Sequence, residues 1–318
     1  MEQAKSKHQR SNQGQSFLII TTLAIILSIT GFALSGTFGI IVALGTAGFL
    51  IMASRKASPA MLLKMYKARP IEPHELQELQ QIFHSLVKRA DLNVTPRLYY
   101  VPSEMLNAFA VGRGQQSVVA VTHGLLEHMT NRELAGVLAH ELSHIKHKDL
   151  SVMGLADVFS RMTTTMGNVG QLMVLLSIPL VLFGKQPLLP WSVVLVLLVT
   201  PMLSGMLQLA LSRSREFEAD LGAAQISGDP NGLALALRKI DQAQTSWLQK
   251  MLLPGRKIPA PALLRTHPPT EDRISRLTEL SGKALPAPVA MPEIEFSPPM
   301  PQQALRRPRW HIMTGLWY

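Results

Sequence analysis

Four stretches of the chain are long, apolar and free of ionisable side chains. They cover residues 17–34, 36–53, 166–183 and 188–211. A helix of 18 residues is about 27 Å long, which is enough for the roughly 30 Å hydrocarbon layer of a membrane. The sequence therefore predicts four transmembrane helices in two hairpins. Helices buried in a protein core are the alternative, which the absence of any charge over such lengths disfavours.

Basic residues flank these stretches on one side only. They are Lys5, Lys7, Arg10, Arg55, Lys56, Lys64, Lys67, Arg69, Arg213 and Arg215. The turns inside the two hairpins carry almost no charge. The first is Ser35, and in the second, residues 184–187, Lys185 is the only charged residue. Because basic residues stay on the cytoplasmic side, both hairpins are predicted to enter from the cytoplasm and both termini to remain there. A signal peptide cleaved near residues 33–35 is the rival prediction, but the first apolar stretch is longer than a signal-peptide core and a second follows at once.

The rest of the chain divides into hydrophilic segments of different character. Residues 1–16 form a basic N-terminal segment before the hairpin of residues 17–53. Residues 55–150 and 213–283 together have the size of one ordinary domain, so we expect a single domain that the second hairpin, residues 166–211, interrupts. Residues 284–318 begin with a proline-rich stretch and are predicted to be a flexible tail.

Within the first hydrophilic piece, the spacing of apolar residues changes along the chain. Residues 75–88 have the period of an amphipathic helix, and three short β-prone runs follow at residues 97–101, 107–111 and 117–122. A further helix is predicted to begin at Thr130, where Glu133 completes the spacing of a capping box. The expected fold class is α+β, mostly helical with a small mixed sheet, attached to four transmembrane helices.

The helix that begins at Thr130 contains the sequence His140-Glu141-Leu142-Ser143-His144. Histidines at positions i and i+4 lie on the same face of a helix, so both imidazoles can reach one metal ion. Glu141 is placed to act as the general base on a nucleophilic water. His147 extends the same side of the helix, but a solvated position at the helix C-terminus is the better interpretation for it.

A third metal ligand is expected in the acidic segment that follows the fourth apolar stretch. In a helix, Glu216 and Asp220 share one face, whereas Glu218 points away from it. Glu216 can then bind the metal while Asp220 orients a ligand histidine, and Glu218 is solvated or paired with an arginine. The alternative is a solvated acidic patch in which Arg213 and Arg215 are the partners.

Composition narrows the function further. Hydrophobic residues make up 47% of the chain and charged residues only 16%, which supports a lipid bilayer as a partner. There is no cysteine, which excludes disulfides and Cys-based zinc sites. The formal net charge of +10 is compatible with nucleic acid, but the basic residues cluster at the ends of the apolar stretches and no aromatic–basic motif accompanies them. No nucleic acid is therefore expected as a partner.

Four motifs in this order make the chain resemble the HtpX-type membrane zinc endopeptidases, which are relatives of the CAAX prenyl proteases. They are His140-Glu141-x-x-His144, Glu216-x-x-x-Asp220, Asn107-Ala108-Phe109-Ala110-Val111-Gly112 and His267-Pro268-Pro269-Thr270 with Arg273. The resemblance covers residues 17 to about 280. It implies a zincin-like catalytic domain that binds one Zn²⁺ per chain through His140, His144 and Glu216. Glu141 is then the catalytic base, and Asp220 supports a ligand histidine.

The same resemblance extends to the substrate and the cellular role. It implies that the strand from Asn107 pairs with substrate backbone and that His267 and Arg273 lie near the substrate or transition state. The implied protein is a multi-pass protease of the bacterial inner membrane that cleaves misfolded or damaged membrane proteins on the cytoplasmic side. Two alternatives remain: a maturation protease of the CAAX prenyl protease type, for which four spans look too few, and a non-enzymatic zinc-binding membrane scaffold, against which Glu141 argues.

Overall fold

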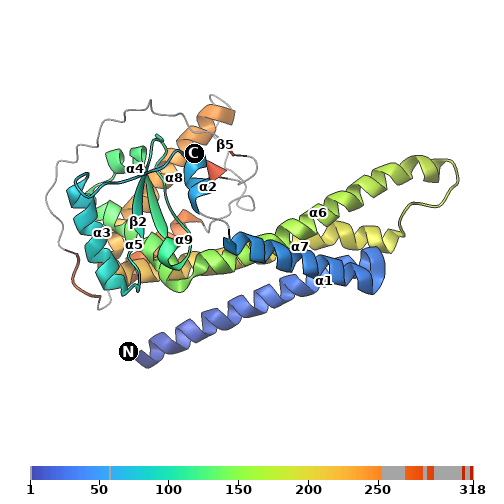
Figure 1. Ribbon diagram of the computed structural model, residues 1–318, viewed down its shortest axis with the longest axis horizontal. Helices are drawn as coiled ribbons and strands as arrows, with labels where there is room; N and C mark the ends of the chain where they lie inside the picture. Colours follow the sequence, from blue (N-terminus) through green and yellow to red (C-terminus); the bar gives the residue numbers. More distant parts are fainter. Residues whose placement is uncertain are drawn as a thin grey trace. The chain divides into compact units, whose positions relative to one another are not determined.

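The computed structural model describes residues 2–56, 59–252, 269–281, 285–289, 310–311 and 316–317. The chain divides into two compact units (Figure 1). We call Met1–Ala57 with Ser151–Ser214 the apolar unit, and Ser58–Leu150 with Arg215–Tyr318 the hydrophilic unit. His267 and most of the proline-rich tail lie outside the described residues.

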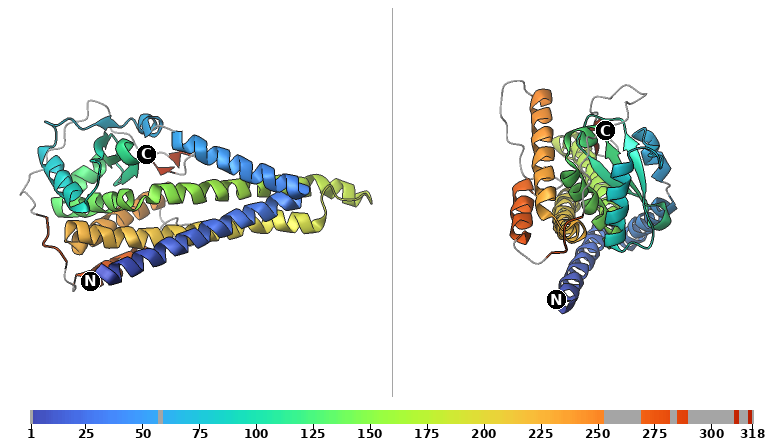
Figure 2. Two further views of the ribbon diagram at one scale, coloured as in Figure 1. Left: turned by 60° about the horizontal axis from the view of Figure 1, so that its bottom comes forward. Right: turned by 90° about the vertical axis from the view of Figure 1, so that its left-hand side faces the viewer.

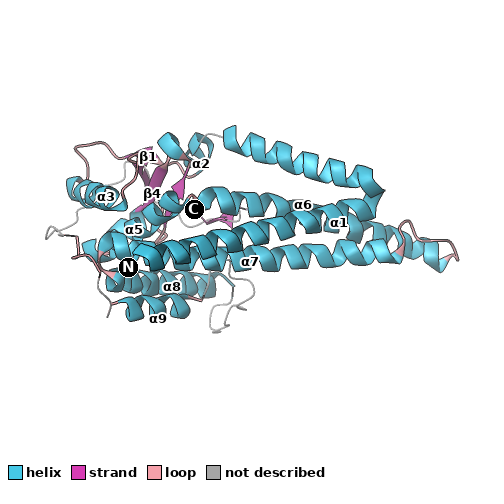
Figure 3. Ribbon diagram, turned by 90° about the horizontal axis from the view of Figure 1, so that it is seen from below, coloured by secondary structure: helices cyan, strands magenta, loops and turns pink. Residues whose placement is uncertain are grey.

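The apolar unit consists of long helices. Helix α1 (Glu2–Lys56) is interrupted at Ser35 (φ −152°, ψ 32°) and Gly36 (φ 58°, ψ −144°). Gly36 has the positive φ that glycine adopts without a steric penalty, so the chain reverses between the two predicted apolar stretches. Residues from both arms of α1 share one buried cluster with α6 (Asp149–Leu182) and α7 (Trp191–Ser227), and these helices lie alongside one another (Figure 3).

Three helical segments of the described residues are long and apolar enough to cross a membrane. They are Gly14–Ala53, which contains the reversal at Ser35, and the helices α6 and α7. Many large apolar side chains of these helices are exposed, which is the opposite of the pattern in a water-soluble bundle. They include Phe17, Ile25, Phe32, Phe38, Ile41, Phe49, Leu175, Leu182, Leu195 and Met202. These surfaces imply a lipid bilayer, so the protein is a membrane protein.

The hydrophilic unit is built on a mixed four-stranded sheet. Its strands are β1 (Arg69–Pro70), β2 (Arg97–Val101), β3 (Ala108–Val111) and β4 (Val118–Thr122), in the order β1-β2-β4-β3. β2 and β4 are parallel, while β1 and β3 are antiparallel to their neighbours. The small mixed sheet expected from the sequence is confirmed. β3 is an edge strand, and among the described residues no strand pairs with its outer side.

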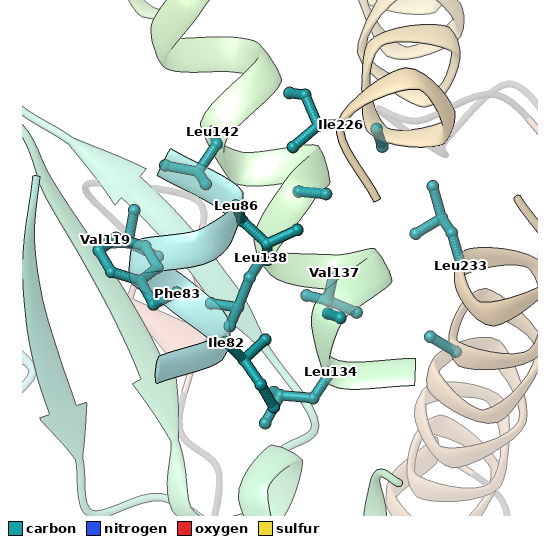
Figure 4. Packing of buried hydrophobic residues seen from close by; sticks show 14 of the residues in the cluster. Ile82, Phe83, Leu86, Val119, Leu134, Val137, Leu138, Leu142, Ile226 and Leu233 are labelled. Atoms are coloured by element: carbon teal, nitrogen blue, oxygen red, sulfur yellow. The ribbon is translucent and has the colours of Figure 1, made fainter. Parts of the chain in front are cut away.

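Side chains of β4 alternate between two buried clusters, as the pleat of a strand requires. Val119 and Val121 face the main core, whereas Val118 and Ala120 face a smaller cluster under α2 (Pro59–Met65). The main core joins the sheet to helices α3 (Gln77–Ala90), α4 (His123–His128) and α5 (Asn131–His147). Figure 4 shows Phe83 of α3 and Leu138 of α5 packed beside Val119.

Helix α5 is the central helix of the hydrophilic unit. It begins with the predicted capping box, in which Thr130 accepts from the backbone N–H of Glu133 and the Glu133 side chain accepts from the backbone N–H of Thr130. On the side away from the sheet it packs against the end of α7 and against α8 (Pro230–Leu252), and α9 (Thr270–Leu280) lies beside α8 (Figure 2). In the tail, β5 (Trp310–His311) pairs with β6 (Leu316–Trp317).

Close approach of α5 to its neighbours depends on glycine at two positions. A Cβ at Gly136 would lie 2.6 Å from the backbone nitrogen of Leu233, and a Cβ at Gly222 would lie 3.0 Å from the Cβ of Ser143. Ser143 belongs to the His140–His144 motif. The second contact therefore brings α7 against the part of α5 that carries the histidines.

Candidate metal centre

Helix α5 presents His140 and His144 on one buried face. Their Nε2 atoms face each other at 3.1 Å, and the two rings are nearly perpendicular, at 88°. This juxtaposition follows from the i, i+4 spacing, which places both side chains one helical turn apart on the same side.

Glu216 reaches the same point from α7. Its Oε2 lies 3.5 Å from Nε2 of His140, and its Oε1 lies 4.0 Å from Nε2 of His144. One ligand atom from each of the three residues lies within 4.8 Å of the others, and all three residues are buried. The structure therefore brings the three sequence-predicted ligands together.

The chemistry of this donor set fits a metal ion. Two imidazole nitrogens and one carboxylate are the protein ligands of a catalytic zinc site, which leaves a fourth position open. Burial by itself lowers the pKa of His140, but its contacts with Asp220 and Glu216 outweigh burial and raise that pKa to about 10. The protein thus favours a positive charge where the imidazoles and Glu216 converge. A divalent cation supplies such a charge.

Asp220 lies one helical turn beyond Glu216, on the same face of α7. Its Oδ1 is 3.1 Å from Nδ1 of His140, the ring nitrogen that points away from the metal position. Arg273 of α9 donates two hydrogen bonds to Asp220, at 2.6 and 2.8 Å, and its Nη1 lies 3.1 Å from Oε2 of Glu216. Burial lowers the pKa of Arg273, but the bond to Asp220 outweighs that effect, so the guanidinium stays charged.

His144 has a carboxylate partner of its own, which the sequence analysis did not find. Its Nδ1 lies 3.0 Å from Oδ2 of Asp149, the first residue of α6. Arg215 in turn donates to Asp149 at 3.1 Å and to Glu218 at 3.2 Å. The only signal in the sequence is an acidic residue five positions after the second histidine.

Glu141 lies beside the two histidines and next to the edge strand β3. Burial raises the pKa of its carboxyl group, and the nearby charges of His140 and His144 act in the opposite direction. A hydrogen bond from the backbone of Ala110 also lowers the pKa. A carboxyl group with a raised pKa is suited to accept a proton and then return it.

Glu218, Asn107 and His147 each contact a residue other than the three predicted ligands. Glu218 is paired with Arg215, as the helical geometry predicted. The backbone of Asn107, just before β3, is bonded to Thr122. His147 contacts Ser143 through Nδ1, at 3.3 Å from Oγ. Arg273 contacts Asp220 and Glu216, and its contact with substrate stays a prediction.

Fold and site together define a class of protein: a membrane-embedded metalloprotease with a buried His-His-Glu centre next to a glutamate. The chain belongs to peptidase family M48, whose family model matches residues 73–281. Its substrates are therefore polypeptides.

Two named relatives, at 34% and 36% identity, support this membership. Protease HtpX of Legionella pneumophila (strain Lens) is 34% identical over 286 residues, which are 84% of this chain and 98% of that protein. Protease HtpX homolog of Burkholderia ambifaria (strain MC40-6) is 36% identical over 279 residues, 82% of this chain and 93% of that protein. The crystal structure of S. mikatae Ste24p is similar with a TM-score of 0.46 and 19% identity, over 84% of this chain and 65% of that chain.

Proposed function

We propose that the protein is a zinc-dependent integral membrane endopeptidase that cleaves misfolded or damaged membrane proteins on the cytoplasmic side of the bacterial inner membrane. The observation that carries this proposal is the convergence of His140, His144 and Glu216 beside Glu141. These residues match, one by one, the ligand and base positions that a zinc peptidase needs.

Zinc is the ion that this donor set favours. Two imidazoles and one carboxylate, with no cysteine in the chain, suit Zn²⁺ better than Mg²⁺ or Ca²⁺, which prefer oxygen ligands. Bound at this centre, zinc supplies Lewis acidity to the scissile carbonyl and to the attacking water. One ion per chain is expected, held by His140, His144 and Glu216.

Glu141 carries out the proton transfers. It takes the proton of the attacking water and then delivers it to the amine nitrogen that leaves when the peptide bond breaks. The raised pKa of its carboxyl group suits the second step, because a weaker carboxylic acid holds the proton until the amine can accept it.

Strand β3 is the proposed site for the substrate chain. Its outer edge has no described partner strand, and the backbone of Ala110 on this strand hydrogen-bonds Glu141. An extended polypeptide that pairs with such an edge places its own peptide bonds beside the catalytic base. Main-chain pairing depends little on sequence, which supports unfolded or damaged proteins as substrates. Asn107, His267 and Arg273 are expected near the bound chain.

The two arms of α1, together with α6 and α7, are proposed to make four membrane crossings. The reversal at Ser35 and Gly36 separates two apolar arms, each long enough to span the hydrocarbon layer. The positive-inside rule then places the hydrophilic unit and both termini in the cytoplasm. A cysteine introduced at Ser151 should be protected from a membrane-impermeant reagent added to intact cells. Labelling from outside would contradict this orientation.

Cleavage of an unfolded protein in detergent tests the enzymatic proposal. The purified, zinc-loaded chain should degrade it, and the Glu141→Gln variant should bind zinc equally well but lose nearly all activity. Glu127→Gln is the matched control, because Glu127 is an exposed glutamate of α4 outside the metal centre. Zinc binding without any cleavage by the parent would support the scaffold alternative and contradict the proposal.

A further inference from the structure

A second buried ion network lies next to the metal centre and is formed by Asp149, Arg215 and Glu218. The exposed fractions of their side chains are 1%, 5% and 10%. Arg215 bonds both carboxylates, and Asp149 also contacts His144. Burying three charged groups is costly, so such a network persists only where its members are closely paired.

The network repeats, at His144, the arrangement that surrounds His140. Nδ1 of each histidine faces an aspartate, at 3.1 Å in Asp220 and 3.0 Å in Asp149, and each aspartate is bonded by a buried arginine. A carboxylate on Nδ1 fixes the tautomer that leaves the lone pair of Nε2 free for a metal. Asp220 was expected from its spacing to Glu216 on α7. Asp149 lies on a different helix, α6, so that spacing could not predict it.

The position of the network along the chain sets it apart from an ordinary ion pair. Asp149 is the first residue of α6, and Arg215 immediately precedes the ligand Glu216 on α7. The two residues are 66 positions apart, and the whole second apolar hairpin lies between them in the sequence. Their bond therefore joins the first residue of α6 to the part of α7 that carries Glu216.

We propose that Arg215 is a positioning residue that acts through Asp149. By holding the Asp149 carboxylate against Nδ1 of His144, it fixes the orientation of that ligand relative to Glu216 on its own helix. Glu218 completes the network by accepting the second hydrogen bond from Arg215. This inference rests on the proposed function, because it assigns the network to a metal site.

Zinc affinity of the full-length protein in detergent, measured by competition with a chromophoric chelator, tests the proposal. Asp149→Ala should weaken zinc binding by about 10–100-fold, the usual effect of removing the partner of a ligand histidine. Arg215→Met should weaken it by about tenfold, while Arg215→Lys, which keeps the charge, should recover part of the loss. Asp149→Asn should lie between Asp149→Ala and the parent, because the amide oxygen can accept the same hydrogen bond.

A matched control exists in the same unit. Arg132 of α5 bonds Asp229 through two nitrogens, and neither residue contacts the metal centre. Asp229→Asn should lower the midpoint of thermal unfolding yet leave zinc affinity within about twofold of the parent. A network that only stabilised the fold would behave like this control.

Two further readouts separate positioning from general stability. In the Co²⁺-substituted protein, Asp149→Ala and Arg215→Met should alter the visible absorption of the metal, whereas Asp229→Asn should not. The double variant Asp149→Ala with Arg215→Met should bind zinc about as well as Asp149→Ala alone, because both substitutions remove the same path to His144. If Asp149→Ala fails to fold, zinc affinity and the cobalt spectrum are compared between the parent, Asp149→Asn and Arg215→Lys.

The outcomes distinguish this inference from the proposed function. Parental zinc affinity and an unchanged cobalt spectrum in Asp149→Asn, Arg215→Met and Arg215→Lys would overturn the inference alone. If instead the parent binds no zinc, or His144→Ala binds it as tightly as the parent, the proposed function fails first and the inference fails with it.

Discussion

Replacing Gly222 with alanine should loosen the metal centre through helix packing, without touching a ligand. Gly222 lies on α7, six residues after Glu216, and faces Ser143 of α5. An added Cβ would lie 3.0 Å from the Cβ of Ser143 and 3.4 Å from Cε1 of His147. The Ser143 hydroxyl can rotate away, but its Cβ is fixed to the α5 backbone.

The distances set the size of the effect. Ordinary contact begins at 3.4 Å, so the two helices must separate by at least about 0.4 Å at this point. Metal–ligand distances tolerate changes of only about 0.2 Å. Overpacking costs about 1–3 kcal/mol, and the higher helix propensity of alanine returns about 0.5–1 kcal/mol. We expect a net loss of about 0.5–2 kcal/mol in unfolding free energy and at least about tenfold weaker zinc binding.

Chelator competition and thermal unfolding of the purified chain measure both effects. Gly205→Ala is the control on the same helix, because no atom lies within 4 Å of the Cβ that it adds. It should leave zinc affinity unchanged. Adding Ser143→Ala to Gly222→Ala should leave most of the loss in place, because alanine keeps the Cβ at position 143 that the new Cβ meets at 3.0 Å. Zinc affinity of Gly222→Ala equal to that of the parent would refute the argument that this contact sets the spacing between the ligands.

Three further predictions concern the core, pH and the acidic segment of α7. Leu138→Ala removes a fully buried side chain of α5 and should cost about 2–5 kcal/mol in chemical denaturation; a cost under 1 kcal/mol would mean that the core is not packed as described. Because the pKa of His140 is raised to about 10 without metal, zinc must displace a proton there, and apparent zinc affinity should fall about tenfold for each unit by which the pH drops below about 10. Calorimetry in two buffers of different ionisation enthalpy should count about one released proton, and no release would contradict that protonation state. Glu216→Ala should abolish tight zinc binding, because it removes a predicted ligand. The zinc affinity of Glu218→Ala should stay within about threefold of the parent, because Arg215 keeps its hydrogen bond to Asp149. A metal analysis that finds zinc in Glu216→Ala and none in Glu218→Ala would refute the ligand assignment.

The elements that the sequence predicted well depend on spacing within one helix. The capping box at Thr130 and Glu133 and the i, i+4 pair His140 and His144 are fixed once a helix forms, because its geometry determines which side chains are neighbours. The same periodicity placed Glu216 and Asp220 on one face of α7. Periodicity could not show that α7 meets α5. The expectation of a third ligand on α7 came from the acidic segment after the fourth apolar stretch and from the resemblance to a known family.

What the sequence did not reveal depends on contacts between distant segments. The contacts of Asp149 and Arg215 join residues 66 positions apart, and no local pattern specifies which buried arginine meets which aspartate. β1 was not predicted, because two residues, one of them proline, show no alternation. Helix α6 begins at Asp149, well before its apolar stretch, and α7 continues to Ser227, because hydropathy marks the lipid-facing part of a helix and not its ends.

The dependence of peptide-bond cleavage on bound zinc tests the central claim most directly. The purified full-length protein would be stripped of metal with a chelator, and cleavage of an unfolded protein would be followed while zinc is returned stepwise. The account predicts no cleavage by the stripped protein and a rate that rises in proportion to zinc bound, up to one ion per chain held by His140, His144 and Glu216. Cleavage that persists in the stripped protein, or a fully zinc-loaded protein that cleaves nothing, would contradict it.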